Sequence, residues 1–251
     1  MKFIVLVGFL IASSVGMAAD DYSEWSKHFY QTQDVAQFDG FWKTVLKEKM
    51  LENRNQINPV IGFSSQVFHK HPELSKGRMD NLESFPKAAR ESVLKLLWLS
   101  DTDETRAILA KTGSTEYSGK APPPIGTLKI NTGQELDLCW GWYFATGDTA
   151  ALDPIISALD FGRYAGALKK YKTSQRTEED KQAAIKGAIF RAAMWSLRAN
   201  GVEDPRIAKH IRILFFDPQT PESRKVWLGV LFARVSPNIS KQELDDNKAG
   251  R

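Results

Sequence analysis

Helix-start signals recur along this chain. A capping side chain stands either directly before a proline or three residues before an acid, and both arrangements deal with the free N–H groups of a first helical turn. Alternating β-branched runs are few, and the best of them, residues 127–130, is short. We therefore expect an all-α protein. These start signals are Asn58-Pro59, Asp101 with Glu104, Thr132 with Glu135, Thr177 with Asp180, Asp204-Pro205 and Thr220-Pro221, and Phe85-Pro86 opens a further, strongly apolar segment.

The clearest single helix is predicted over residues 178–199. Apolar residues recur there at steps of three and four, which is typical of a helix with one buried stripe. Asn200-Gly201 then supplies a stop signal. The stripe consists of Ile185, Ile189, Ala192, Trp195 and Ala199.

Short connections between the predicted helices indicate antiparallel neighbours. The restarts are too unevenly spaced for a regular helical repeat. We expect an irregular array of antiparallel helix pairs, like a degenerate helical repeat, with a compact orthogonal bundle as the alternative. The predicted parts are an N-terminal half (19–112), a connection rich in proline and glycine (113–131), a C-terminal half (132–237) and a polar tail (238–251).

The first 18 residues have the pattern of a cleaved signal peptide. Met1-Lys2 precedes an apolar run over residues 3–15, and Gly16-Met17-Ala18 provides a small-residue cleavage site. The run is shorter than the roughly 20 residues that a spanning helix needs. We expect cleavage after Ala18 and a periplasmic or secreted product that is not an integral membrane protein.

Charge and cysteine content exclude several functional classes. The formal net charge is +4, and the excess is spread along the chain, so we expect no nucleic acid partner. The single cysteine, Cys139, permits no internal disulfide, and its apolar surroundings predict a buried thiol rather than a nucleophile. Gly119-Lys120 lacks the remainder of a phosphate-binding loop, and we expect no cofactor.

His69 and His71 are the candidate metal ligands. Residues two apart point to different sides of a helix, so this spacing forms a poor chelate. Both precede Pro72 at a predicted helix end, where an imidazole can bind terminal carbonyl groups. We prefer this polar-terminus interpretation to a metal site.

Asp137 is the candidate catalytic residue, because the segment around it is apolar on nearly every side. A buried acid can have a raised pKa and act as a general acid, whereas a first-turn carboxylate is simply stabilised by the helix dipole. The neighbouring aromatic side chains of Trp140, Trp142 and Tyr143 form either a ligand groove or part of the core.

A basic cluster follows later in the chain, with no acid between its members and with Tyr164 and Tyr171 interleaved. It predicts either a solvated helix face or attraction to an anionic surface or acidic partner. Its members are Arg163, Lys169, Lys170 and Lys172.

Three segments, residues 58–68, 136–159 and 192–205, resemble a family of exported, all-helical bacterial proteins of uncharacterised function. The resemblance implies export and a helical fold, and it carries over no active site. Our leading hypothesis is an exported, non-enzymatic protein that binds or scaffolds an unidentified protein or envelope partner. The alternative is a hydrolase of an envelope polymer with Asp137 as general acid.

Overall fold

The computed structural model describes residues 18–79, 82–173 and 177–236. Within these ranges every regular element is helical, eleven α-helices and six short 3₁₀ helices, and there is no strand, so the all-α prediction is confirmed. The expected stacking of helix pairs in the manner of a repeat protein is not confirmed. The predicted tail (238–251) and, apart from Ala18, the predicted signal peptide lie outside the described residues.

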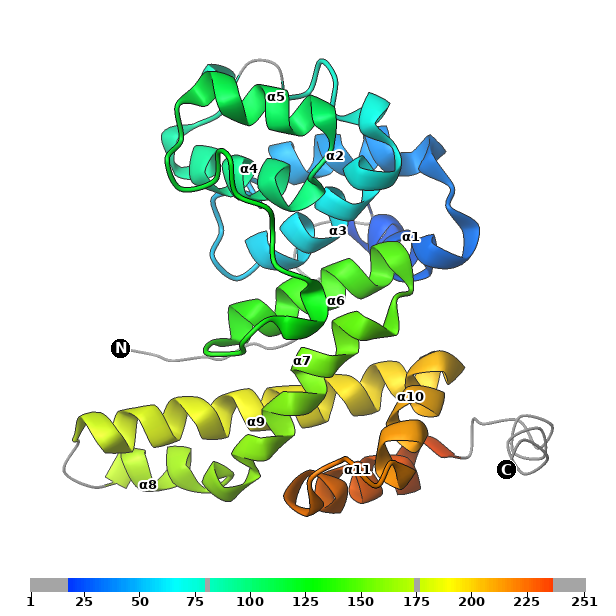
Figure 1. The fold of residues 1–251 in the computed structure, drawn as a ribbon, viewed down its shortest axis with the longest axis vertical. Coiled ribbons are helices and arrows are strands. Elements are labelled where there is room, and N and C mark those ends of the chain that lie inside the picture. Colours follow the sequence, from blue (N-terminus) through cyan, green and yellow to red (C-terminus); the bar gives the residue numbers. More distant parts are fainter. Residues whose placement is uncertain (1–17, 80–81, 174–176, 237–251) are drawn as a thin grey trace. The chain divides into compact units, whose positions relative to one another are not determined.

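The chain divides into two compact units. Of the described residues, the N-terminal unit comprises those up to Leu128 together with Gln134–Ala151, and the C-terminal unit comprises Lys129–Gly133 together with those from Leu152 onward. The N-terminal unit contains α1 (Ala18–Thr32), α2 (Phe38–Lys47), α3 (Ile57–Lys70), α4 (Lys87–Ser100), α5 (Asp103–Thr112) and α6 (Gly133–Thr146) (Figure 1). It also contains η1 (Val35–Gln37), η2 (Pro72–Leu74), η3 (Leu82–Ser84), η4 (Ile125–Thr127) and η5 (Thr149–Ala151).

An aromatic cluster joins α1, α2 and α3 in the core of the N-terminal unit. The ring of Phe63 lies 5.4 Å from that of Trp25 and 5.3 Å from those of Phe29 and Phe41, in edge-to-face arrangements. All four side chains are buried. Burial of rings of this size supplies much of the hydrophobic stabilisation of such a unit.

Two glycines allow α6 to cross α3 at backbone contact. A Cβ atom at Gly62 would lie 2.2 Å from the carbonyl oxygen of Leu138, and one at Gly141 would lie 2.2 Å from that of Pro59. Only glycine permits so close an approach. Most of α6 therefore belongs to the N-terminal unit, whereas the sequence predicted it as the first helix of the C-terminal half (132–237).

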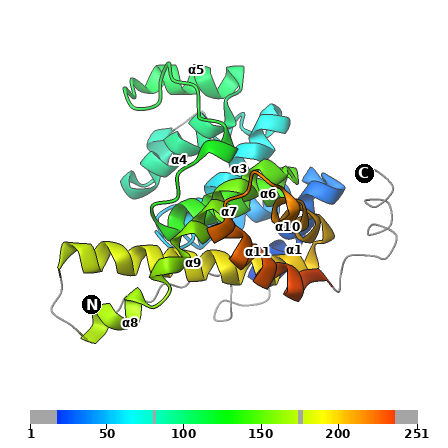
Figure 2. The same ribbon diagram turned by 60° about the horizontal axis from the view of Figure 1, so that its bottom comes forward.

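The C-terminal unit is built around α9 (Glu178–Glu203), the longest of its helices. Figures 1 and 2 both show α8 (Ala167–Thr173) beside the first half of α9. At Gly187 a Cβ atom would lie 2.2 Å from the carbonyl oxygen of Tyr164, so η6 (Ala158–Tyr164) also approaches α9 closely. The remaining elements are α7 (Leu152–Ser157), η6 (Ala158–Tyr164), α8 (Ala167–Thr173), α10 (Pro205–Phe216) and α11 (Glu222–Val235).

Helix starts in the C-terminal unit follow the predicted signals closely. The Thr177 hydroxyl accepts from the backbone N–H of Asp180 at 3.1 Å, and the Asp180 side chain bonds back to the N–H of Thr177, forming the expected capping box. Asp204 caps α10 directly before Pro205, also as expected. At α11 the cap is Pro221, one residue beyond the expected Thr220.

In the N-terminal unit two predicted caps are wrong. Asn58 lies inside the first turn of α3, where its buried carboxamide oxygen accepts from the Lys95 ammonium at 3.3 Å instead of capping the helix. Asp101 ends α4 in the left-handed conformation (φ 47°), so the capping box of α5 begins one residue later, at Thr102, and uses Thr105 in place of Glu104.

Two details of the predicted helix over residues 178–199 are wrong. The helix continues through Gly201 to Glu203 and ends only before Pro205, which cannot extend it. Trp195, assigned to the buried stripe, is 48% exposed. The buried line instead runs through Ile189, Ala193 and Leu197, because neighbours lie against that face of the helix.

No helix in the described ranges combines the length and the apolar character needed to cross a membrane.

The proline segment 122–124 is extended, as three prolines require, and is followed by η4. The connection is tied to α4 before the prolines, since the indole N–H of Trp98 donates to the carbonyl oxygen of Lys120 at 2.8 Å.

Candidate functional site

The aromatic side chains of α6 differ in their access to solvent. Trp140 is 4% exposed and Tyr143 is fully buried, so these two rings pack inside the molecule and present no surface to a ligand. Trp142 is half-buried. The apolar residues of α6 lie on nearly all sides of the helix, as expected for a helix that crosses α3 at Gly62 and Gly141. Its position in the unit decides which of its aromatic rings remain accessible to solvent.

Asp137 lies in α6 among these residues and is partly buried. Burial raises the pKa of its carboxyl group to about 7, and no side-chain hydrogen bond or ion pair to another described residue offsets this effect. Such a carboxyl group can release or accept a proton near neutral pH. This raised pKa is the property that the sequence analysis required of a general acid.

Cys139 lies two residues further along α6 and is fully buried. Burial, together with the negative charges of Glu135 and Asp137, raises the pKa of its thiol to about 12. A thiol with this pKa carries almost no thiolate at neutral pH, so it is a poor nucleophile. The residue packs as a small apolar side chain, as the sequence analysis expected.

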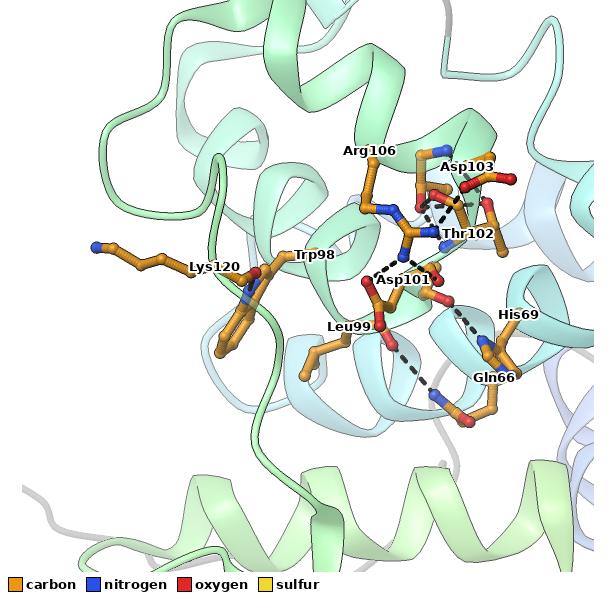
Figure 3. Close-up of polar contacts among 11 residues, drawn as sticks. Gln66, His69, Trp98, Leu99, Asp101, Thr102, Asp103, Arg106 and Lys120 are labelled. Carbon is orange, nitrogen blue, oxygen red and sulfur yellow. Dashed lines mark hydrogen bonds and ion pairs between the residues drawn. The ribbon is translucent and has the colours of Figure 1, made fainter.

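His69 lies at the corner between α4 and α5. Figure 3 shows its imidazole pointing at the C-terminal end of α4, where Nδ1 lies 2.7 Å from the carbonyl oxygen of Ser100. Because a carbonyl can only accept, Nδ1 carries the proton in this contact. Gln66, one turn earlier on α3, donates to the carbonyl oxygen of Leu99 at 3.3 Å.

The same corner is closed on its outer side by Arg106. Its guanidinium group donates to the Asp101 carboxylate at 2.6 Å and to the Asp103 carboxylate at 2.7 Å, and it also reaches the Asp101 carbonyl oxygen at 2.9 Å (Figure 3). The last carbonyl groups of a helix have no partner inside it. Gln66 and His69 of α3 and Arg106 of α5 supply partners for the carbonyl groups at the end of α4, so these side chains have a structural role.

His71 lies in a different environment, with Nδ1 3.5 Å from a carboxylate oxygen of Glu73. Within the described ranges, no three histidine, cysteine or acidic side chains lie close enough together to hold a metal ion. His69 binds one terminal carbonyl group, that of Ser100 in α4, whereas the sequence predicted the carbonyl groups at the end of its own helix.

The basic cluster spans η6 and α8 in the C-terminal unit. Arg163 and Lys169 are exposed, whereas for Lys170 and Lys172 only the helical backbone is described. The guanidinium carbon of Arg163 lies over the Tyr164 ring, 4.8 Å from its centroid. The close packing of η6 on α9 adds a cation that the sequence analysis missed, Lys186, whose ammonium nitrogen lies 5.3 Å from the same centroid.

We define the basic patch as Arg163, Tyr164, Lys169 and Lys186. The ammonium group of Lys186 also lies 5.8 Å from the centroid of Phe161. Cations held over aromatic rings are attracted by the electron-rich ring face, which restrains flexible side chains at the surface. The patch thus presents positive charge in a partly ordered form.

Two charged pairs in the C-terminal unit were not signalled by the sequence. Arg224 makes two hydrogen bonds to the carboxylate of Asp160, at 2.9 and 2.5 Å, and these contacts raise the pKa of the Arg224 guanidinium. His210 Nε2 lies 2.9 Å from an Asp153 carboxylate oxygen. The partners are more than 50 residues apart, so only the packing of α10 and α11 brings them together.

No protein-family model matches the chain, and comparison with curated proteins and with solved structures finds no similar protein.

Proposed function

We propose that this chain is an exported helical binding protein that attaches to an anionic lipid surface of the bacterial envelope through the basic patch. The observation that carries the proposal is the placement of two cations, Arg163 and Lys186, over the single ring of Tyr164, beside exposed Lys169. The signal-peptide pattern of the first 18 residues supports an envelope location.

The segment that carries Arg163, Tyr164 and Lys169 is free of acids, since residues 161–176 contain no aspartate or glutamate. Asp160, directly before them, is already paired with Arg224, and the carboxylate of Glu178, after them, is paired with Lys181 at 3.2 Å. The two acids that flank the segment are thus engaged by cations outside the patch.

The expected gain can be stated from general electrostatics. Each Lys or Arg near an anionic lipid surface contributes about 1 kcal/mol, so the three basic residues of the patch give roughly 3 kcal/mol, or about a hundredfold in affinity. Exposed charges more than a Debye length from the surface are screened, so binding should weaken strongly with salt.

Co-sedimentation of residues 19–251 with lipid vesicles tests the proposal. We expect binding to vesicles containing phosphatidylglycerol, little binding to phosphatidylcholine vesicles, and release at high salt. A variant with three glutamines in the patch should bind about a hundredfold more weakly. It carries Arg163→Gln, Lys169→Gln and Lys186→Gln.

A control variant removes the same number of charges from elsewhere in the C-terminal unit, and it should keep most of the binding. It carries Arg198→Gln, Lys209→Gln and Arg234→Gln. Equal losses in both variants would mean that only net charge matters, and the basic patch would then be rejected as the attachment site.

Export has its own test. Protein purified from an exporting bacterial cell should begin at Ala19, because Gly16-Met17-Ala18 fits the cleavage pattern. N-terminal sequencing that finds Met1 would reject both the cleavage and the envelope location.

A second candidate function, hydrolysis of an envelope polymer, is favoured by one observation, the pKa of Asp137 of about 7. Asp137→Asn keeps the size of the side chain and removes the acid. Loss of activity against cell-wall material with an unchanged circular dichroism spectrum would favour the enzyme, whereas no activity in the unsubstituted protein would exclude this reaction.

A further inference from the structure

The N-terminal unit contains a cavity of about 400 Å³ between the end of α2, the turn that follows it, and the start of α4. This volume falls within the range of small-molecule sites, roughly 300–1,000 Å³. The lining residues are Trp42, Val45, Leu46, Lys49, Leu51, Glu52, Arg78, Ser84, Phe85, Pro86 and Ala89.

Apolar side chains form most of the lining. Trp42, Val45, Leu51 and Phe85 are each less than 9% exposed, and they belong to the core of the unit. Leu46 is 44% exposed, which is high for a leucine and leaves apolar surface uncovered. A ligand with an apolar body would cover this surface.

Two opposite charges on the lining lack partners. Neither the Lys49 ammonium nor the Glu52 carboxylate makes a side-chain hydrogen bond or ion pair with any described residue, and both residues are exposed. Arg78, the third charged residue of the lining, is already engaged, because its guanidinium binds the Asp39 carboxylate and the Leu74 carbonyl oxygen. The charges available to a ligand are therefore one cation and one anion.

The backbone at Lys49 has an unusual conformation. Its φ of 53° lies in the left-handed region, which a lysine adopts only when its surroundings require it. Hydrogen bonds hold the turn, from Met50 N–H to the Val45 carbonyl at 3.0 Å and from Glu52 N–H to the Lys49 carbonyl at 2.9 Å. The turn thus fixes the backbone that carries both charged residues of the cavity lining.

We propose that this cavity binds a small zwitterion with an apolar side chain, the chemistry shared by a free hydrophobic amino acid and a hydrophobic dipeptide. Its carboxylate pairs with Lys49, its ammonium group pairs with Glu52, and its apolar side chain lies against Trp42, Leu46 and Phe85. The site lies in the N-terminal unit and is independent of the basic patch, which belongs to the C-terminal unit.

Both charges are needed for this recognition. A ligand that is only an anion would meet Glu52 as a like charge, and a ligand that is only a cation would meet Lys49 in the same way. A zwitterion without an apolar body would leave the surface of Leu46 and Trp42 uncovered. Matched analogues therefore separate the three contributions.

Saturation-transfer NMR on residues 19–251 can rank phenylalanine against three analogues: 3-phenylpropanoate, which lacks the ammonium group, 2-phenylethylamine, which lacks the carboxylate, and glycine, which lacks the side chain. We expect phenylalanine to bind at least about tenfold more tightly than each of them. The dipeptide Leu-Phe is the second arm, and the tighter of the two identifies the source of the zwitterion.

Two variants test the assigned residues. Lys49→Asn removes the cation with a residue that tolerates a positive φ, so the turn is retained, and Glu52→Gln removes the anion. Each should weaken binding of the preferred zwitterion about tenfold, whereas the control variants Lys43→Gln and Glu104→Gln, at exposed positions outside the lining, should not. Circular dichroism verifies that each variant is folded.

The proposal is overturned if neither phenylalanine nor Leu-Phe binds at millimolar concentration. Equal binding of phenylalanine and its singly charged analogues would also reject it, since recognition would then be apolar only. Unchanged affinity in both Lys49→Asn and Glu52→Gln would place any binding elsewhere on the protein.

Discussion

Replacing Gly62 with alanine places a methyl group inside the crossing of α3 and α6. The new Cβ atom would lie 2.2 Å from the Leu138 carbonyl oxygen and 3.0 Å from the Trp142 backbone nitrogen. Both neighbours are backbone atoms, so no side-chain rotation relieves the overlap. The helices must separate by on the order of 1 Å, in a core packed at crystal-like density.

The cost follows from the burial of α3. Every residue of this helix from Asn58 to Phe68 is buried, so a shift disturbs its contacts on all sides. Overpacking of a tight core costs typically 1–3 kcal/mol and sometimes more, and a backbone clash lies at the upper end. We expect Gly62→Ala to lower the free energy of unfolding by about 3 kcal/mol or more.

Urea denaturation followed by circular dichroism measures this loss, and hydrogen exchange can localise it to the N-terminal unit. Gly166→Ala is the matched control, since a Cβ atom there has nothing within 4 Å, and we expect no loss or a gain of about 0.5 kcal/mol. Gly141→Ala should resemble Gly62→Ala, and the double variant should lose less than the sum, because one separation of the helices relieves both clashes. A loss below about 1 kcal/mol for Gly62→Ala would refute the backbone-contact argument.

Further predictions concern Asp137, His69 and the proline-rich connection. The raised pKa of Asp137, about 7 against an ordinary 3.8, means that the folded state holds a proton that the unfolded chain releases. The contribution of this group to the free energy of unfolding should therefore fall as the pH rises from about 4 to 7, and Asp137→Asn should remove that fall in a pH series of urea denaturations. His69→Ala leaves the Ser100 carbonyl without its partner and should lower the free energy of unfolding by about 1–2 kcal/mol. The control His28→Ala, at a half-exposed side chain, should change it little. Equal losses in the two variants would contradict a stabilising role for the His69–Ser100 contact. Limited trypsin digestion should cut first after Lys111 or Lys120, because both are exposed. Lys111 lies in the last turn of α5, and Lys120 lies between α5 and η4, where no helix is assigned. Early cuts only after Lys169, Lys170 or Lys172 would place the most accessible connection in the basic segment.

Much of the secondary structure follows from the sequence because the signals that carry it are local. The box of Thr177 and Asp180 and the pair Asp204-Pro205 act within one helical turn, and both start helices as predicted. Such signals are weaker where tertiary contacts compete for the same side chain. Asn58 binds Lys95 instead of capping, and Asp101 ends one helix rather than starting the next.

The candidate sites depend much more on the tertiary structure. The sequence marked Arg163, Lys169 and Tyr164 as a basic and aromatic cluster, but Lys186 joins them only because Gly187 lets η6 approach α9. The sequence also predicted that His69 binds a carbonyl group at a helix end. The carbonyl group that it binds belongs to Ser100, 31 residues away, and no local signal connects the two.

Local pattern determined that this chain forms helices and where most of them begin, because helix formation is decided by neighbours within about four residues. Which face of each helix is buried was decided by packing alone, and Trp195 shows this, since it shares an apolar stripe with buried Ile189 and is nevertheless exposed. The cavity beside Lys49 and Glu52 likewise arises where the end of α2, the turn after it and the start of α4 come together. Its lining comes from segments that no local signal connects, so no reading of the sequence could have placed it.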